Sequence, residues 1–290
     1  MGLRLKFNLV MLAVFVVGLG VTGYLSYELL HRNARDEVLR NAGVMMEAAL
    51  SMRGYTVGKV RPLLPYDPDK FLPESVPAFA ATEIMGLLRK KYPDYSYKEA
   101  ALNPTNPRNR AVDWESDLLN AFRSGTGGSE ISGVRDTPTG RSLYLARPLQ
   151  IRDEACLSCH THADMAPVSM VRLYGANNGF GWKLNEVVAA QIVSVPMDLP
   201  IRNANRAFVT FMSSLAVVFT VLFVLLNAML TLFIVQPITQ LSQTAEMISR
   251  GRLDVPDFAD RGRDEVSQLG QAFNRMRRSL EKAIALIEKG

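Results

Sequence analysis

The stretch FNLVMLAVFVVGLGVTGYLSY, residues 7–27, decides the architecture because it runs for 21 residues without a charged side chain. As an α-helix it would be about 30 Å long, the thickness of the hydrocarbon core of a bilayer. A signal peptide is the alternative, since Arg4 and Lys6 precede the run. Its apolar part would normally be about 7–15 residues long and be followed by a small-x-small cleavage site, which is missing here. We therefore expect a retained transmembrane helix over residues 1–30.

A second uncharged run, at about residues 207–235, predicts another transmembrane helix. Its length suffices to cross a bilayer with tilt, and it is too long and apolar for an ordinary buried helix. Pro237 lies just beyond it, where a new helical segment can begin. Basic residues lie near both ends of the predicted spans, so they do not indicate which side is cytoplasmic. The positive-inside rule also loses force for a connecting segment as long as the outer domain, residues 31–206. Charge alone leaves the topology undecided.

The overall composition excludes several classes of protein. A hydrophobic content of 48% with 21% charged residues is inconsistent with a disordered chain. The mean hydropathy, near zero, is too low for a polytopic transporter. The 33 basic and 28 acidic residues give a net charge of only +5, scattered along the chain. We expect a lipid membrane as a partner and no nucleic acid.

Both cysteines of the chain lie in one motif, Cys156-Leu-Ser-Cys159-His160. The C-x-x-C-H pattern is typical of c-type haem attachment. Two thiols at this spacing can add to the two vinyl groups of one porphyrin, which places the adjacent histidine beneath the iron. We expect one covalent haem c, bound by Cys156 and Cys159, with His160 as the proximal iron ligand.

Two other chemistries remain open for the cysteine pair. A thioredoxin-like dithiol would lie between a strand and a helix of a βαβ unit, but Thr161–Pro167 does not resemble a useful helix. A zinc site would need two further ligands, and only His162 is near. Haem is the favoured interpretation.

Haem attachment also predicts the topology and leaves a question about the sixth ligand. In bacteria this attachment occurs outside the inner membrane, so residues 31–206 would be periplasmic and both termini cytoplasmic. Either a methionine or a vacant position is compatible with the sequence. A methionine tends to raise the reduction potential, whereas an open face can bind a small gas. The candidate methionines are Met45, Met46, Met52, Met165 and Met170.

The outer domain is predicted to be α+β with an antiparallel sheet, because helices precede several short strands. Residues 61–77 carry five prolines and predict an irregular segment. Gly175, Gly179 and Gly181 indicate hairpin turns. The aromatic residues Tyr144, Tyr174, Phe180 and Trp182 would line a haem pocket or belong to an ordinary core. The expected helices are residues 32–59, 82–91 and 114–123, and the expected strands are 95–102, 130–134, 141–147, 170–173, 180–184 and 187–195.

The tail, residues 236–290, contains two short heptad patterns. Apolar residues recur at spacings of three and four in 238–248 and again in 266–280. Pro237, Gly251 and the pair Asp264-Glu265 complete a close resemblance to a HAMP linker, which implies a homodimer through a four-helix bundle. An amphipathic hairpin on the membrane is less compatible with such narrow stripes. No kinase, cyclase or methyl-accepting segment follows within these residues, so we expect a separate kinase or chemoreceptor as output protein.

The outer domain resembles a family of single-haem periplasmic sensor domains with a PAS-like fold. The resemblance implies haem bound through Cys156, Cys159 and His160. Members can use a cysteine of the first helix as sixth ligand, but this chain has no third cysteine, and Met52 is the substitute by helix position. The matching segments are Arg53-Gly-Tyr55-Thr56, Arg61-Pro-Leu-Leu64, Val76-Pro77-Ala78, Asn106-Pro-Arg-Asn109, the cysteine motif, Ala166-Pro167 and Gly179-Phe-Gly-Trp182.

Together these patterns favour a homodimeric inner-membrane haem sensor that passes a redox or small-gas signal through the HAMP-like tail. A membrane-anchored c-type cytochrome that carries electrons is the second hypothesis, although a carrier has no need of a signalling linker. A haem-free dithiol protein is the third. We expect no enzymatic turnover.

Overall fold

The computed structural model describes residues 2–64, 67, 69–252, 254–258, 262 and 264–287. Two compact units are present: one is Tyr27–Ala207, and the other combines Met1–Ser26 with Phe208–Gly290. Helix α1, Leu3–Tyr55, contributes residues to both units. Pro65 and Pro68 of the expected irregular segment, and Leu253 of the tail, lie outside the described residues.

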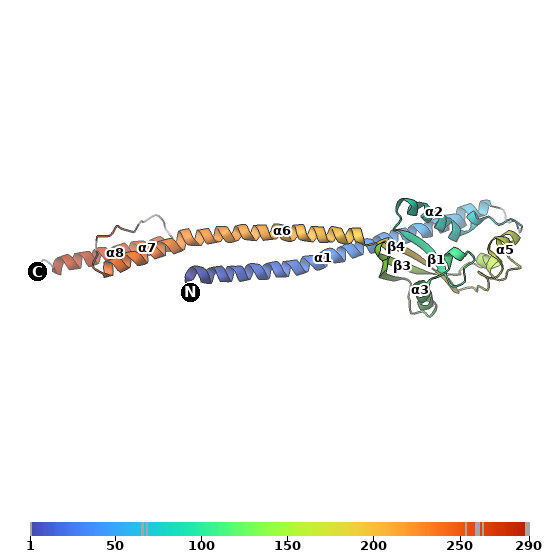
Figure 1. The fold of residues 1–290 in the computed structure, drawn as a ribbon, viewed down its shortest axis with the longest axis horizontal. Coiled ribbons are helices and arrows are strands. Elements are labelled where there is room, and N and C mark those ends of the chain that lie inside the picture. Colours follow the sequence, from blue (N-terminus) through green and yellow to red (C-terminus); the bar gives the residue numbers. More distant parts are fainter. Residues whose placement is uncertain are drawn as a thin grey trace. The chain divides into compact units, whose positions relative to one another are not determined.

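The unit Tyr27–Ala207 is built on a four-stranded antiparallel sheet (Figure 1). The strand order β1-β4-β3-β2 places the last strand of the sequence in the centre, between the first and the third. Alternate residues of each strand point to opposite faces, so each face needs its own cover. The strands are β1 Ser96–Ala101, β2 Ile131–Thr137, β3 Gly140–Gln150 and β4 Val187–Pro196.

The outer part of α1 covers one face of the sheet. Val38, Ala42 and Met46 recur at helical spacing and pack against Leu143 and Val193, and all five are almost fully buried. Met46 is fully buried in this stripe, whereas its neighbour Met45 is only partly buried. The predicted helix over residues 32–59 is confirmed up to Tyr55, where a π-helical turn, Thr56–Val60, follows.

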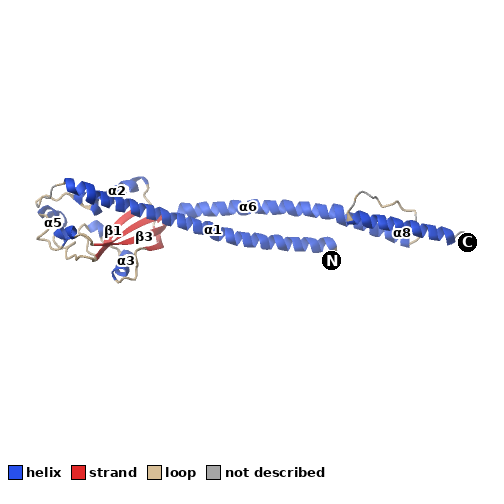
Figure 2. Ribbon diagram, turned by 180° about the vertical axis from the view of Figure 1, so that it is seen from behind, coloured by secondary structure: helices blue, strands red, loops and turns tan. Residues whose placement is uncertain are grey.

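Helix α3, Asp113–Arg123, covers the opposite face of the sheet (Figure 2). Its Leu118, Leu119 and Phe122 pack onto a surface made largely of alanine, where side chains are small enough for the helix to approach closely. The strand residues of this surface are Ala100, Ala146, Ala190 and Ile192.

The predicted α+β class with an antiparallel sheet is confirmed, and two expected strands are wrong. Residues 170–173 belong to helix α5, Val168–Tyr174, and residues 180–184 form no strand. Short apolar runs do not distinguish a strand from one or two helical turns. Helix α2 also begins earlier than expected, at Pro77, and runs to Lys91, because proline suits the first helical position.

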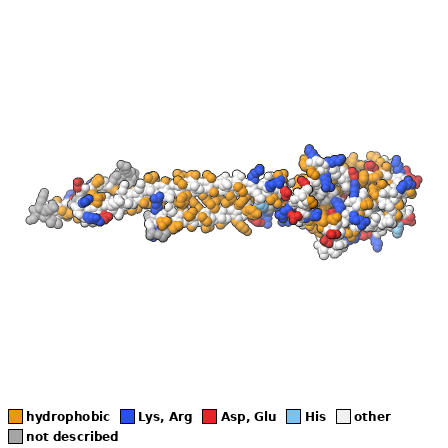
Figure 3. Space-filling model, in the orientation of Figure 1, with side chains coloured by type: hydrophobic (Ala, Val, Ile, Leu, Met, Phe, Trp, Pro, Cys, Tyr) orange, Lys and Arg blue, Asp and Glu red, His pale blue; other side chains and the backbone are white. Residues whose placement is uncertain are grey.

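The described residues include two helices that are long and apolar enough to cross a membrane, Arg4–Leu63 and Asp198–Ser249. Only 6% of the most apolar window of each is buried, which argues against the core helices of a soluble protein. Phe15 stacks on Phe219 with ring centroids 4.9 Å apart. Figure 3 shows hydrophobic side chains and few charged ones along the long helices. Helix α6, Asp198–Met229, continues through a π-helical segment, Leu230–Val235.

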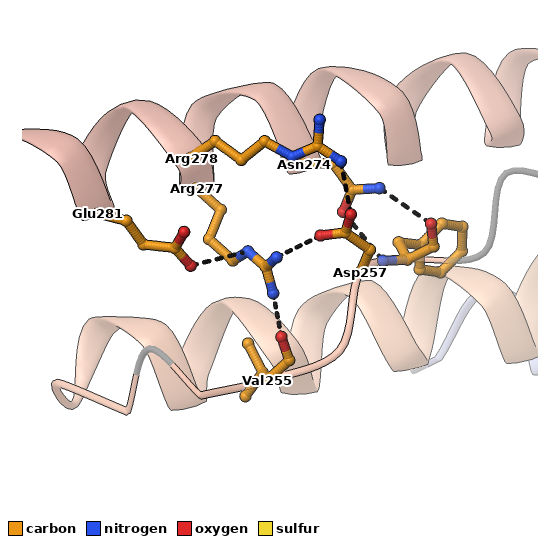
Figure 4. Close-up of polar contacts among 7 residues, drawn as sticks. Val255, Asp257, Asn274, Arg277, Arg278 and Glu281 are labelled. Atoms are coloured by element: carbon orange, nitrogen blue, oxygen red, sulfur yellow. Dashed lines mark hydrogen bonds and ion pairs between the residues drawn. The ribbon is translucent and has the colours of Figure 1, made fainter.

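The tail consists of α7, Gln236–Ser249, and α8, Glu265–Ile287, joined by a connector that α8 holds in place (Figure 4). The Asn274 side chain accepts a hydrogen bond from the Phe258 amide and donates one to its carbonyl, both 2.9 Å long. Arg277 donates to the Val255 carbonyl and pairs with Asp257. A hydrogen bond from Arg278 lowers the pKa of Asp257.

The buried stripe of α8 therefore differs from the predicted heptad stripe. Within one chain, Ser267, Gly270, Asn274 and Arg277 are buried, at spacings of three and four. Of the five apolar heptad residues, Leu269, Met276 and Leu280 are exposed, whereas Val266 and Phe273 are half-buried. The helix has one polar face for its own connector and one apolar face without cover in a single chain.

Replacing Met46 by alanine should destabilise the unit Tyr27–Ala207 by about 2–5 kcal/mol, because it leaves a cavity in the core between α1 and the sheet. Urea unfolding of the detergent-solubilised protein measures this through tryptophan fluorescence, since both tryptophans, Trp114 and Trp182, lie in this unit. Val44→Ala, on the exposed side of the same helix, is the matched control and should change stability by less than about 0.5 kcal/mol. Equal effects of the two substitutions would contradict the packing described here.

Candidate functional site

The cysteine motif lies on two short helical turns after the sheet. A 3-10 turn, Glu154–Cys156, leads directly into α4, Leu157–His160. The Asp153 carboxylate accepts a hydrogen bond of 2.9 Å from the Ala155 amide and so fixes the start of the first turn. Residues three apart lie on the same side of a helical turn, so Cys156 and Cys159 face one way. Both cysteines are half-buried, and neither is in a disulfide.

The orientation of the His160 imidazole is set by a backbone carbonyl. Its Nδ1 lies 2.7 Å from the Gly179 carbonyl oxygen. Since a carbonyl only accepts hydrogen bonds, Nδ1 carries the proton and Nε2 keeps its lone pair. The ring also stacks on Trp182, with centroids 3.9 Å apart and planes 12° from parallel. Burial lowers the pKa of His160, and the Gly179 hydrogen bond opposes this shift, so the imidazole is neutral at pH 7.

The glycine loop after α5 fastens the motif through its backbone. The Gly181 amide donates to the Thr161 carbonyl at 2.9 Å, and the Trp182 amide donates to the His160 carbonyl at 3.2 Å. Gly179 has a φ of +81°, and a Cβ there would lie 1.9 Å from Thr105 Oγ1. Only glycine fits this position. The prediction of hairpin turns is wrong here, because helix α5 and not a strand precedes the loop.

An apolar floor lies beneath the motif. Cys156 and Leu157 pack, with Trp182, on a cluster of buried residues at one end of the sheet. Burial is the main cause that raises the pKa of the Cys156 thiol, and the charge of Asp153 raises it further. The buried residues of the cluster are Ala101, Ile151, Val188 and Ala189.

This set of groups suits a covalently bound haem. Two thiols project from one turn, an imidazole offers a bare Nε2, and the adjoining floor is apolar. For zinc, no three His, Cys, Asp or Glu side chains converge within the described part of the chain. For a dithiol of the thioredoxin type, α4 has only four residues and the sheet is antiparallel. Haem is the group that these residues fit.

Of the aromatic residues expected near a haem, Trp182 lies against His160. Tyr144 lies instead on the opposite face of the sheet, beside Trp114 under α3. Tyr174 contacts Phe71.

The candidate sixth ligands have different surroundings. Met46 belongs to the core under α1, and Met170 is buried in the short helix α5. Met165 is exposed. Met52 is half-buried one turn before the π-helical segment, where its carbonyl accepts a hydrogen bond from the Thr56 hydroxyl. Its role as an iron ligand stays a prediction.

Sequence reasoning missed two contacts beside the motif. Arg53 forms an ion pair with Glu99, at 2.6 Å to each carboxylate oxygen, and Thr105 approaches the His160 ring. The available signal was Glu99 itself, a charged residue that lies two positions after Tyr97 and two before Ala101, on the same face of the strand. Alternation along β1 places its side chain on the covered α1 face, where a carboxylate requires a partner.

Comparison with known families gives two matches. Residues 31–196 match the Tll0287-like family (Tll0287), and residues 229–282 match the HAMP domain. The chain belongs to the Tll0287-like family. Its match begins at His31 and ends at Pro196, so it contains the outer part of α1, the whole sheet and the cysteine motif. The HAMP match takes in α7, the connector and most of α8.

One solved structure is similar to this Tll0287-like chain. The crystal structure of the cyanobacterial heme-protein Tll0287 is 14% identical, with a TM-score of 0.44, over 55% of this chain and 95% of its own. Comparison with curated proteins finds no match. The two family matches confirm the resemblance of the sequence to a haem sensor domain followed by a HAMP linker.

Gly179→Ala should destabilise the Tll0287-like domain by more than about 1 kcal/mol, because the added Cβ meets Thr105 and the positive φ disfavours alanine. Gly181→Ala is the matched control, since Gly181 has the same φ of +81° and no atom within 4 Å of the added Cβ. Urea unfolding followed by tryptophan fluorescence should show the larger loss for Gly179→Ala. Equal losses would mean that the contact with Thr105 does not constrain the loop.

Proposed function

We propose that this chain is a membrane-bound haem c receptor subunit that passes a redox or small-gas signal from the periplasm through its HAMP domain. Haem is attached through Cys156 and Cys159, with His160 Nε2 as the proximal iron ligand. The observation that carries the proposal is the hydrogen bond from His160 Nδ1 to the Gly179 carbonyl. It fixes the tautomer and the ring orientation that an iron ligand needs, next to two half-buried thiols on one turn.

The attachment chemistry requires no oxidant. The Cys156 thiol adds across one vinyl group, so that its sulfur bonds to one vinyl carbon and its proton goes to the other. The Cys159 thiol does the same at the second vinyl group. Of the two cysteines that would hold the haem, Cys156 packs on the apolar floor. The bound group supplies a one-electron redox centre or an axial position for a gas.

The membrane arrangement follows from the haem. Periplasmic attachment would put residues 31–206, a domain with a PAS-like fold, outside the bacterial inner membrane. Residues 1–30 and 207–235 form the two spans, and both termini are cytoplasmic. Arg4 and Lys6 at the N-terminal end support this orientation.

In this proposal the HAMP domain comprises residues 236–290 and forms a homodimer. The exposed heptad residues Leu269, Met276 and Leu280 support this, because a second copy of the same stripe would cover them in a four-helix bundle. A kinase or chemoreceptor is the output partner that this proposal names, and the proposal assigns no catalytic role to the chain.

The full-length protein, produced in a host that matures c-type cytochromes, should show a Soret band that survives denaturation, because the haem is covalent. Cys156→Ser with Cys159→Ser should abolish the covalent haem, and His160→Ala should alter the spectrum by removing the proximal ligand. His162→Gln is the matched control and should leave both unchanged, since His162 is exposed. Wild-type protein without a Soret band would overturn the haem assignment.

Signalling is tested in the same preparation with Leu269→Cys. Crosslinking between two copies by a bismaleimide, which bonds to both thiols without an oxidant, should occur at this exposed heptad position, and its extent should differ between oxidised, reduced and carbon-monoxide-treated protein. Crosslinking that is identical in all haem states, in a protein that titrates with potential, would favour the electron carrier instead.

Met52→Leu should lower the reduction potential of the haem and abolish a sulfur-to-iron charge-transfer band, because methionine ligation raises the potential. Met165→Leu is the control on an exposed methionine and should change neither property. A spectrum and potential unaffected by Met52→Leu would exclude this residue as the sixth ligand.

A further inference from the structure

Three rows of side chains cross the α1 face of the sheet, and the middle row is polar. The register pairs Glu99 with Gln191 and Gln191 with Arg147. On one side lies the apolar row Ala101, Ala189 and Leu149, which belongs to the floor of the cysteine motif. On the other side lies the row Tyr97, Val193 and Leu145, which belongs to the core under α1. The polar row thus separates the motif from the helix core.

Two ion pairs join the polar row to α1, and α1 contributes the positive charge to one of them and the negative charge to the other. Arg53 of α1 pairs with Glu99 at 2.6 Å, and Glu47 of α1 pairs with Arg147 at 2.6 Å. The two pairs differ in their exposure to water. Glu99 is only 4% exposed, whereas the Glu47 carboxylate is largely exposed. Solvent weakens the second pair, and the first is the strong one.

Glu99 is held by more than the guanidinium. The Tyr97 hydroxyl donates to Glu99 at 2.6 Å and accepts from the Gln191 side-chain amide at 3.0 Å. Burial raises the pKa of Tyr97 strongly, and the neighbouring Glu99 charge raises it further, so this hydroxyl remains a donor. The carboxylate therefore has a fixed position and Arg53 a fixed anchor.

Arg53 also lies within electrostatic reach of the haem motif. Together with Arg61 it is a cation whose field acts on the Cys156 thiol, against the larger effect of burial. The next sheet row beyond Glu99 begins at Ala101, on whose cluster Cys156 packs. The ion pair therefore joins helix α1 to the sheet row next to the one on which Cys156 packs.

We propose that Arg53, anchored by Glu99, is the positioning residue that couples the charge of the bound haem to helix α1. The inference rests on the proposed function, since it requires the haem. One-electron reduction by a soluble electron donor removes one positive charge beside the pair, with no bond made or broken. The oxidised site repels Arg53 and attracts Glu99, and reduction relieves both effects. The contact between α1 and the sheet thus differs in free energy between the two redox states.

Reciprocity makes this coupling measurable as a potential. If the redox state changes the energy of the ion pair, removing a charge of the pair changes the redox equilibrium by the same factor. Arg53→Gln removes a positive charge and should lower the potential. Glu99→Gln removes a negative charge and should raise it. We expect a three- to tenfold change in the equilibrium constant for each, and tenfold corresponds to about 59 mV for a one-electron couple.

The experiment is a redox titration of full-length, haem-loaded protein in detergent, with dithionite as reductant and ferricyanide as oxidant. Arg53→Gln with Glu99→Gln in one chain should return close to the wild-type potential. Glu47→Gln is the matched control, since it removes a carboxylate from the exposed pair of the same interface. It should shift the equilibrium by less than about twofold.

Hydrogen–deuterium exchange over residues 47–56 gives the second readout. Wild-type protein should exchange differently in the oxidised and reduced states, and the double variant should not. Shifts of the same sign for Arg53→Gln and Glu99→Gln would indicate loosened packing and overturn the inference, as would unchanged potentials in protein with a full haem content.

Variants that fold poorly are replaced by Arg53→Lys and Glu99→Asp. These variants conserve the charges, so the reduction potential of the haem should stay close to the wild-type value. A wild-type protein without haem would refute the proposed function, a result distinct from haem-loaded variants with no opposed shifts.

Discussion

The ion pair between Arg53 and Glu99 fixes where α1 ends on the sheet. Upstream, the helix needs only apolar contacts, because Val38, Ala42 and Met46 fill the space above β3 and β4. Such contacts have no strict register, since an apolar stripe can shift by one turn at modest cost. A buried carboxylate allows no such shift, because leaving it unpaired costs several kcal/mol. The pair therefore determines the axial position of the helix, while the apolar stripe supplies most of the burial.

The partner of His160 has a chemical consequence of its own. A carbonyl oxygen accepts the Nδ1 proton without carrying a formal charge, so it orients the imidazole while adding less basicity than a carboxylate would. Orientation comes from backbone geometry, which depends on Gly179 fitting closely against Thr105. The charged groups near the motif, Arg53 and Arg61, act from the side of the cysteines instead. Ring orientation and local charge are thus set by different parts of the chain.

Much of this architecture was predictable from the sequence because its signals are local. The uncharged runs, the C-x-x-C-H spacing and the heptad spacing of the tail each lie within a short window. The prediction failed at residues 170–173 and 180–184, where short apolar runs fit more than one structure and contacts with the motif decide the outcome. The roles of Gly179 and Arg53 depend on partners 74 and 46 positions away, Thr105 and Glu99. Such pairings are absent from any local pattern.

Helix α8 shows why a heptad pattern underdetermines a helix. The stripe Ser267, Gly270, Asn274 and Arg277 has the same spacing as a heptad core, yet it is polar and binds the connector of its own chain. Gly270 leaves room for the Phe258 ring, and Asn274 pairs with the Phe258 backbone. These contacts orient α8 about its own axis, so that Leu269, Met276 and Leu280 face outward as a set. A rotation that covered a different stripe would have to break the buried Arg277 and Asn274 contacts. The connector therefore restricts which faces of α8 a second chain could meet.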